Sequence, residues 1–138
     1  MSDTLLRSKR RLVIISMMLV VALAHIVDIG RYFEEPVRIL FQSYFSDLVL
    51  PFGFYFLLCI DEQWLPGLRR WRVKWAAMIL LPSIAETCQY FGIPVLGSTF
   101  DPLDYLMYAA GATLAAVVET QVFPRLFRFW ALEKKAFI

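Results

Sequence analysis

The sequence contains few of the residues on which redox enzymes and metal sites depend. Only two cysteines and one histidine occur among its 138 residues. Cys59 and Cys88 do not stand at CxxC spacing and fall toward opposite ends of apolar segments, so we expect neither a disulfide nor a reactive thiol. His25 and Asp28 offer a single nitrogen ligand, which favours a structural hydrogen bond over a metal site or a proton relay.

Motifs for catalysis and cofactor binding are also missing. The chain has no GxSxG, GxGxxG, P-loop or HExxH pattern, so nothing in it predicts nucleophilic, nucleotide or zinc chemistry. We therefore expect no enzyme activity and no catalytic residue, cofactor, metal or nucleic-acid partner. Linkers and internal repeats are absent as well, which predicts a single domain over residues 1–138.

Charge is scarce, and long apolar stretches take its place. Charged residues make up 19% of the chain, whereas 59% of the residues are hydrophobic and 16% are aromatic. A soluble domain normally carries about 25% charged residues. The pattern predicts an all-α, four-helix transmembrane bundle whose partner is the lipid bilayer. The expected spans cover about residues 12–29, 44–60, 75–93 and 103–123.

The first of these spans has an alternative interpretation. Basic residues at positions 7–11, the apolar run 12–21 and the small residues at 22–24 also match the three parts of a cleavable signal peptide. Cleavage would remove most of the first span. The other three spans would keep their orientation.

Lysine and arginine are nearly absent from two of the predicted loops, and this asymmetry orients the chain. Four precede the first span, four lie within residues 69–74 and four follow the last span, whereas the first loop has only Arg31 and Arg38. The positive-inside rule therefore places both termini in the cytoplasm. The segments 30–43 and 94–102 are expected outside.

Two amphipathic segments are expected to lie along the membrane interface. Residues 37–44 repeat apolar side chains at helical spacing after Pro36, and the tail from Pro124 mixes aromatic and basic residues. For both segments the alternative is ordinary packing against the bundle.

The ionisable residues of the spans gather toward the predicted outer side, where Asp28 also falls. The candidates for a cleft or binding site are Asp47, Glu86, Gln89, Asp101, Asp104 and Tyr108. Because a charge at membrane depth must be paired or wetted, we expect Arg31, Arg38, protonation or a bound cation to compensate them. The alternative is that these groups only hold the helices together. Asp47 and Asp104 would then sit at helix starts, where the dipole favours an acid.

The fourth span combines small residues with one acid. Four small residues at four-residue spacing predict close packing against another helix, namely Gly111, Ala112, Ala115 and Ala116. Glu119 lies near the cytoplasmic end of this span and is expected to reach toward Arg125 or Lys74.

The outer polar residues resemble a known pattern. Sparse motifs are similar to those of the VanZ-like family of small bacterial membrane proteins, and they read Asp47-Leu48-Val49-Leu50, Glu86-x-x-Gln89 and Asp101-Pro102-x-Asp104. The resemblance implies a four-helix protein of the bacterial inner (plasma) membrane and, for one branch, glycopeptide resistance. An arginine that family members often carry before the last aspartate is missing here.

Three functional hypotheses follow from these residues. The first is a non-enzymatic bundle whose outer cleft binds a polar headgroup, a cation or a cell-envelope component. The alternative is an accessory subunit of a larger respiratory or photosynthetic membrane complex, docking through the small residues of the fourth span and the many aromatics. An ion-coupled carrier is the weakest, because the sequence shows no inverted repeat and no second layer of carboxylates.

Overall fold

The computed structural model describes residues 3–27, 29–95 and 100–130. Every regular element within these ranges is helical, which confirms the predicted all-α class. The long helices are α1 (Asp3–Ile26), α2 (Val37–Asp61), α3 (Trp71–Tyr90) and α4 (Pro102–Val117). The short elements are η1 (Ile29–Tyr32), η2 (Pro66–Arg69), the π-helical η3 (Val118–Val122) and α5 (Phe123–Leu126).

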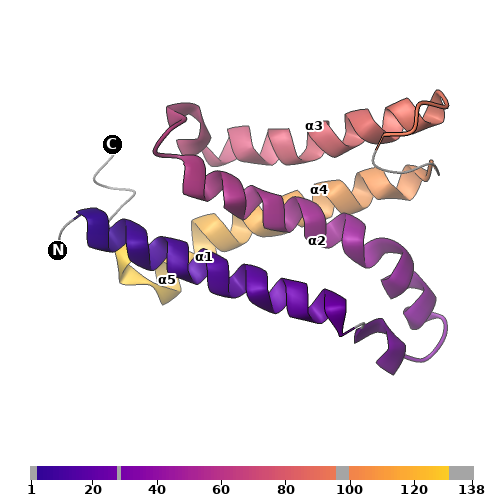
Figure 1. Ribbon diagram of the computed structural model, residues 1–138, viewed down its shortest axis with the longest axis horizontal. Coiled ribbons are helices and arrows are strands. Elements are labelled where there is room, and N and C mark those ends of the chain that lie inside the picture. The colour runs from indigo at the N-terminus through magenta and orange to yellow at the C-terminus, as the bar shows by residue number, and fades with distance from the viewer. Residues whose placement is uncertain (1–2, 28, 96–99, 131–138) are drawn as a thin grey trace.

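Consecutive long helices run in opposite directions (Figure 1). The start of α1, the segment η2 and the helix α5 lie at one end of the molecule, which we call the η2 end. The segment η1, the end of α3 and the start of α4 lie at the opposite end, which we call the η1 end. Short connections between α1, α2 and α3 favour this antiparallel arrangement.

Helix α2 differs most from its predicted form. It runs without interruption for 25 residues from Val37 to Asp61 and contains Pro51. The prediction that residues 37–44 form a segment separate from the second span is therefore wrong. The apolar spacing of that segment continues into the following span, and no glycine or proline separates the two.

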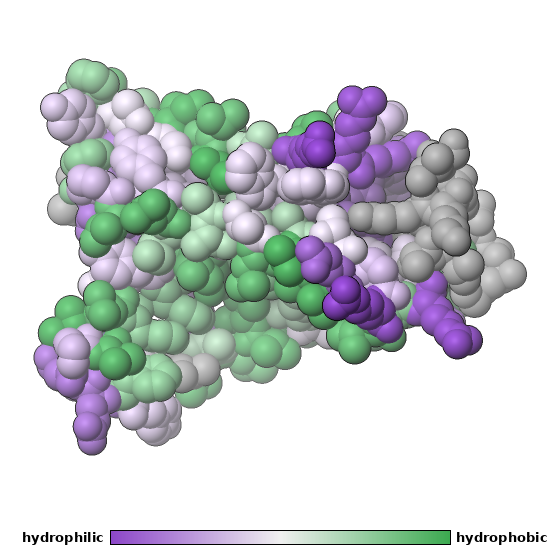
Figure 2. Space-filling view, turned by 180° about the vertical axis from the view of Figure 1, so that it is seen from behind, coloured by the Kyte–Doolittle hydropathy of each residue, from purple (hydrophilic) through white to green (hydrophobic). Residues whose placement is uncertain are grey.

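Within the described ranges, two helices, Val37–Asp61 and Pro102–Leu126, are long and apolar enough to cross a membrane. The second comprises α4, η3 and α5. Helices α1 and α3 carry more charge, because α1 begins with the basic residues at 7–11 and α3 contains Lys74 and Glu86. Figure 2 shows hydrophobic residues across the middle of one face and hydrophilic residues toward its two ends.

Helices α2 and α4 pack at backbone distance. A Cβ atom added to Gly111 would lie 2.0 Å from the carbonyl oxygen of Leu48, so only glycine permits this approach. Ala112, Ala115 and Ala116 are buried on the same helix. The small residues of the fourth span therefore pack within the chain and do not form an external face.

The aromatic residues that follow α4 pack into the bundle. Phe123 is 7% exposed and Trp130 is 1% exposed, with their ring centroids 4.5 Å apart. Trp130 of the predicted tail therefore packs against the bundle, as the packing alternative expects, and the interfacial position of the tail stays a prediction. Arg125 and Leu126 are exposed. The predicted tail beyond residue 130 lies outside the described residues.

Candidate functional site

A groove between α2, α3 and α4 brings together five of the six predicted cleft residues. Its volume is about 800 Å³, within the usual range for ligand sites. The polar residues that line it near the η1 end are Asp47, Glu86, Gln89, Asp104 and Tyr108. Its remaining walls are mostly apolar and extend toward Leu57, Leu58 and Met78. We call this cavity the acidic groove.

Glu86 anchors the polar end of the acidic groove. Its side chain lies on the inward face of α3 and the residue is only 2% exposed. The backbone N–H of Asp101 donates to Oε1 at 2.7 Å, and the Tyr108 hydroxyl donates to Oε2 at 3.4 Å. Glu86 therefore joins the end of α3 to the start of α4.

Asp101 has a structural role and does not line the groove. As the N-cap of α4, its Oδ1 accepts from the backbone N–H of Leu103 at 2.9 Å. Its Oδ2 accepts from the Tyr44 hydroxyl at 3.0 Å, which links α4 to α2. For this residue the interpretation as a helix-holding group applies.

Asp47 and Asp104, unlike Asp101, line the groove. Asp47 lies well inside α2, which begins at Val37, so the interpretation of Asp47 as a helix-start residue is wrong. Asp104 does occupy the first turn of α4. Among the described residues, no side chain hydrogen-bonds or forms an ion pair with either carboxylate.

Gln89 adds a further open acceptor. Its Nε2 donates to the Val95 carbonyl oxygen at 2.9 Å, whereas its buried Oε1 has no hydrogen-bond partner within the described part of the chain. A buried acceptor without a partner is costly unless a donor reaches it. The groove therefore offers acceptors from three residues at its polar end.

The expected arginine partners do not reach this end of the groove. Arg31 hydrogen-bonds the Tyr32 hydroxyl at 2.9 Å, and Arg38 pairs with Glu35. No described residue that lines the groove is basic. Asp28, the other acid predicted on this side, lies outside the described residues.

A second polar cluster, which no local sequence pattern predicts, lies at the η2 end. Its members are Arg10, Glu62, Lys74 and Glu119, which come from four separate segments of the chain and are each no more than 9% exposed. We call it the buried charge cluster. Two cations and two carboxylates balance one another, which is the arrangement that makes buried ions tolerable.

Lys74 lies at the centre of the buried charge cluster. Its Nζ lies 2.8 Å from Glu119 Oε1 and 3.2 Å from Cys59 Sγ, and it also pairs with Glu62. One of the two predicted partners of Glu119 is thus found, but the pair is buried rather than directed to water. The acceptors of Cys59, Glu62 and Glu119 lie within 4.8 Å of one another, and the ammonium supplies the positive charge between them.

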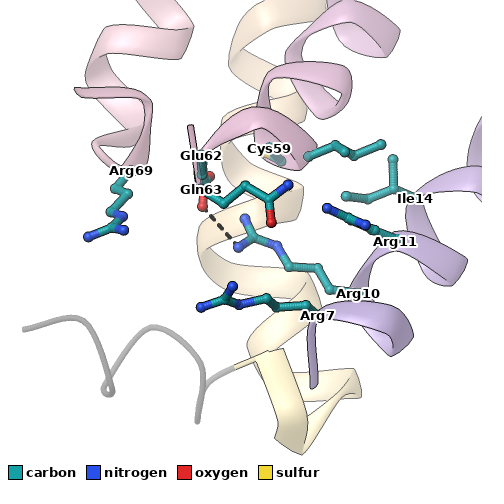
Figure 3. A pocket seen from close by; sticks show the side chains of 9 residues that line it. Arg7, Arg10, Arg11, Ile14, Cys59, Glu62, Gln63 and Arg69 are labelled. Carbon is teal, nitrogen blue, oxygen red and sulfur yellow. Dashed lines mark ion pairs between the residues drawn. The ribbon is translucent and has the colours of Figure 1, made fainter. Parts of the chain in front are cut away.

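Arg10 connects this cluster to α1 and to the C-terminal segment. Its Nη1 lies 2.9 Å from Glu62 Oε2, and its guanidinium lies 4.6 Å from the Trp130 ring centroid. Figure 3 shows this ion pair beside a small basic cavity. The Tyr55 hydroxyl donates to Glu119 from α2.

Three further sequence expectations change, two of them at the η2 end. The chain does have a second layer of carboxylates, Glu62 and Glu119, so the expectation that it lacks one is wrong. Cys59 accepts from Lys74 and is therefore more than an apolar packing residue. His25, in the last turn of α1, was expected to make a structural hydrogen bond. Instead it is exposed and its ring stacks against that of Phe45 at a centroid distance of 6.0 Å.

The members of the buried charge cluster are far apart in the sequence, so no local pattern links them. Arg10 and Lys74 count as ordinary cytoplasmic charges in a loop-charge analysis, and Glu62 falls just beyond the predicted second span. One signal could have pointed to it, namely an acid in the apolar fourth span with a lysine as its suggested partner.

Comparison with family models, curated proteins and solved structures finds no match to the chain.

Proposed function

We propose that this chain is a non-enzymatic, VanZ-like protein that crosses the bacterial inner membrane four times, with both termini in the cytoplasm. The alternating helices support an even number of crossings. Large apolar side chains that cover the outside of α1 support contact with lipid rather than water. Those between 58% and 78% exposed are Leu12, Leu19, Val20, Leu23 and Ile26.

In this arrangement the acidic groove opens toward the outside and binds the cationic or donor-rich head of a small molecule of the cell envelope. One observation carries the proposal: Asp47, Asp104 and the Oε1 atom of Gln89 line one cavity and receive no donor from a described side chain. Carboxylates in a largely apolar cavity are stabilised by an added cation or N–H donor. A role in glycopeptide resistance is a narrower form of the proposal and rests on the family resemblance.

The packing of α4 weakens the accessory-subunit alternative. Gly111 lies against α2, and Ala112, Ala115 and Ala116 are buried within the chain, so these small residues are not available to a partner helix. Exposed aromatic residues such as Trp64 and Phe91 remain as support for that alternative. Purification in mild detergent separates the two hypotheses, because an accessory subunit would come out with stable partner subunits.

The binding proposal is tested by thermal unfolding of the purified protein with ethylammonium chloride or magnesium chloride, against sodium chloride at equal ionic strength. A ligand that binds only the folded state stabilises it by about 2.7 kcal/mol at 100 times its dissociation constant. We expect at least one probe to raise the unfolding temperature of the parent protein. We expect the Asp104→Asn substitution to reduce this increase.

Glu34→Gln is the matched control, because Glu34 is an exposed acid of the η1 end that does not line the groove. Its response to the probes should equal that of the parent protein. Glu86→Gln should fold, because the amide oxygen can still accept from Asp101. If Asp104→Asn and Glu86→Gln both respond like the parent, the acids only hold the helices together and the binding proposal fails.

A further inference from the structure

The apolar part of the acidic groove has the form of a slot that opens sideways. Leu50, Phe54 and Leu57 form one wall at helical spacing on α2, and Leu81 and Ile84 stand on α3. These five side chains are between 39% and 61% exposed although they line a cavity. The slot between α2 and α3 is therefore open along its side and would face hydrocarbon if these helices cross a bilayer.

The length of the slot matches one leaflet of a bilayer. It extends from Asp47 to Leu58 along α2 and from Gln89 back to Met78 along α3. Each stretch measures about 16 Å at the helical rise of about 1.5 Å per residue. Half of a hydrocarbon core of about 30 Å is about 15 Å. A chain lying in this slot would therefore span a single leaflet, with its polar end among the acids.

The polar end of the acidic groove offers hydrogen-bond acceptors but no positive charge, and this determines which headgroup it can bind. The carboxylates of Asp47 and Asp104 and the Oε1 atom of Gln89 can only accept hydrogen bonds when the acids are ionised. The Tyr108 hydroxyl already donates to Glu86, and no described lining residue is basic. A ligand must therefore bring the donors and the positive charge. A protonated primary amine provides both, whereas a phosphate or a carboxylate provides neither.

We propose that the occupant of the acidic groove is a long-chain amphiphile with a protonated primary amine as its headgroup, which enters sideways from the outer leaflet. Its amine lies among Asp47, Asp104 and Gln89, and its hydrocarbon chain follows the slot toward Leu57 and Met78. This inference rests on the proposed function and names the chemical class that the groove takes.

The test uses the full chain in phosphatidylcholine nanodiscs, because that headgroup has no N–H donor. The probe is a long-chain primary amine with a diazirine at the far end of its chain. After illumination, we expect mass spectrometry to find the label on Leu57, Leu58 or Met78, at the end of the slot away from the acids. Excess dodecylamine should abolish this labelling, whereas dodecanol and ethylamine should compete at least about tenfold less well.

Two variants separate the headgroup site from the chain site. Asp47→Asn with Asp104→Asn should weaken labelling by about tenfold or more. Leu57→Trp should block the slot while leaving the acids unchanged, so it tests the proposal even if the double variant folds poorly. Leu19→Trp is the matched control, because Leu19 is 60% exposed on α1 and does not line the groove.

The outcomes distinguish this inference from the proposed function. If dodecanol competes as well as dodecylamine, or if the label is spread over exposed residues such as Leu19, the chain contacts are ordinary bilayer contacts and the inference fails. If ethylammonium stabilises the protein but the long-chain probe does not label the slot, the cation site stands and the amphiphile is wrong. If neither probe binds, both proposals fail.

Discussion

Lys74 illustrates how burial changes the meaning of a single residue. In the sequence it belongs to a run of basic residues that marks a cytoplasmic loop, but in the structure it is fully buried between Glu62 and Glu119. Removing one partner of a buried ion cluster lowers the stability of the fold by more than the intact cluster adds to it, because the remaining buried charges are left unpaired.

We therefore expect Lys74→Met to lower the free energy of unfolding by about 3–5 kcal/mol, since it leaves two carboxylates and one arginine in the interior. Unfolding of the purified protein by increasing denaturant in mixed micelles measures the change. Arg72→Met is the control, because Arg72 is exposed on the same helix and its replacement should cost no more than about 0.5 kcal/mol. Equal effects of the two variants would show that Lys74 is not held by the cluster.

A double variant at this site addresses charge balance directly. Lys74→Met with Glu119→Gln removes one charge of each sign and should recover part of the stability lost in Lys74→Met. The reason is that Arg10 and Glu62 would remain paired at 2.9 Å. The same denaturant measurement on the parent, both single variants and the double variant gives the coupling energy. A coupling of zero would contradict the 2.8 Å contact between Lys74 and Glu119.

At the scale of elements, the α2 and α4 pair depends on one missing side chain. A Cβ atom at Gly111 would meet the rigid backbone of Leu48 at 2.0 Å, whereas one at Gly53 would meet the flexible side chain of Met18 at 2.9 Å. The two glycines therefore form a matched comparison. One faces a neighbour that cannot move without shifting a helix, and the other faces a neighbour that can change its rotamer.

We expect Gly111→Ala to destabilise the protein by about 1–3 kcal/mol and Gly53→Ala to have a clearly smaller effect. Gly67→Ala provides the baseline, because a Cβ added there meets no heavy atom within 4 Å among the described residues beyond its own stretch of chain. Thermal midpoints of the three variants in one detergent make the comparison. A ranking in which Gly53→Ala is the most damaging would contradict the close contact of α2 with α4.

At the scale of the whole molecule, the distribution of charge predicts how the chain is oriented in the membrane. The twelve-to-two distribution of lysine and arginine predicts cytoplasmic termini, and the helix arrangement places η2 at the same end as the start of α1. Glu34 and Gln63 are exposed in connections at opposite ends of the molecule. They are therefore suitable positions for reporter cysteines.

In a Cys88→Ala background, we expect Glu34→Cys to react with a membrane-impermeant maleimide in intact cells and Gln63→Cys to react only after lysis. The background protein without a reporter controls for the native Cys59, which is buried. Reaction of both reporters from outside would exclude the four-span topology. Reaction of Gln63→Cys alone in intact cells would show that the orientation is inverted and that the acidic groove opens to the cytoplasmic side.

The sequence by itself determined the features that depend on neighbours along the chain. Long apolar stretches between clusters of charge predicted the all-helical class. The pairs Gly111 with Ala115 and Ala112 with Ala116 marked one face of a helix, because helical spacing is local. Local patterns also placed Glu86 and Gln89 on one face of α3. The sequence also indicated that a helix begins after Pro36. It did not indicate that this helix continues through residue 44 into the second span.

The tertiary structure alone decided which of these faces meet. Arg10, Glu62, Lys74 and Glu119 converge only because four segments pack with particular rotations about their axes, and no local spacing encodes those rotations. The same packing separated Asp101, which caps α4, from Asp47 and Asp104, which line a groove with few partners. Burial is a property of the assembled chain, and it determines whether a charged residue contacts water, a neighbouring ion or a ligand.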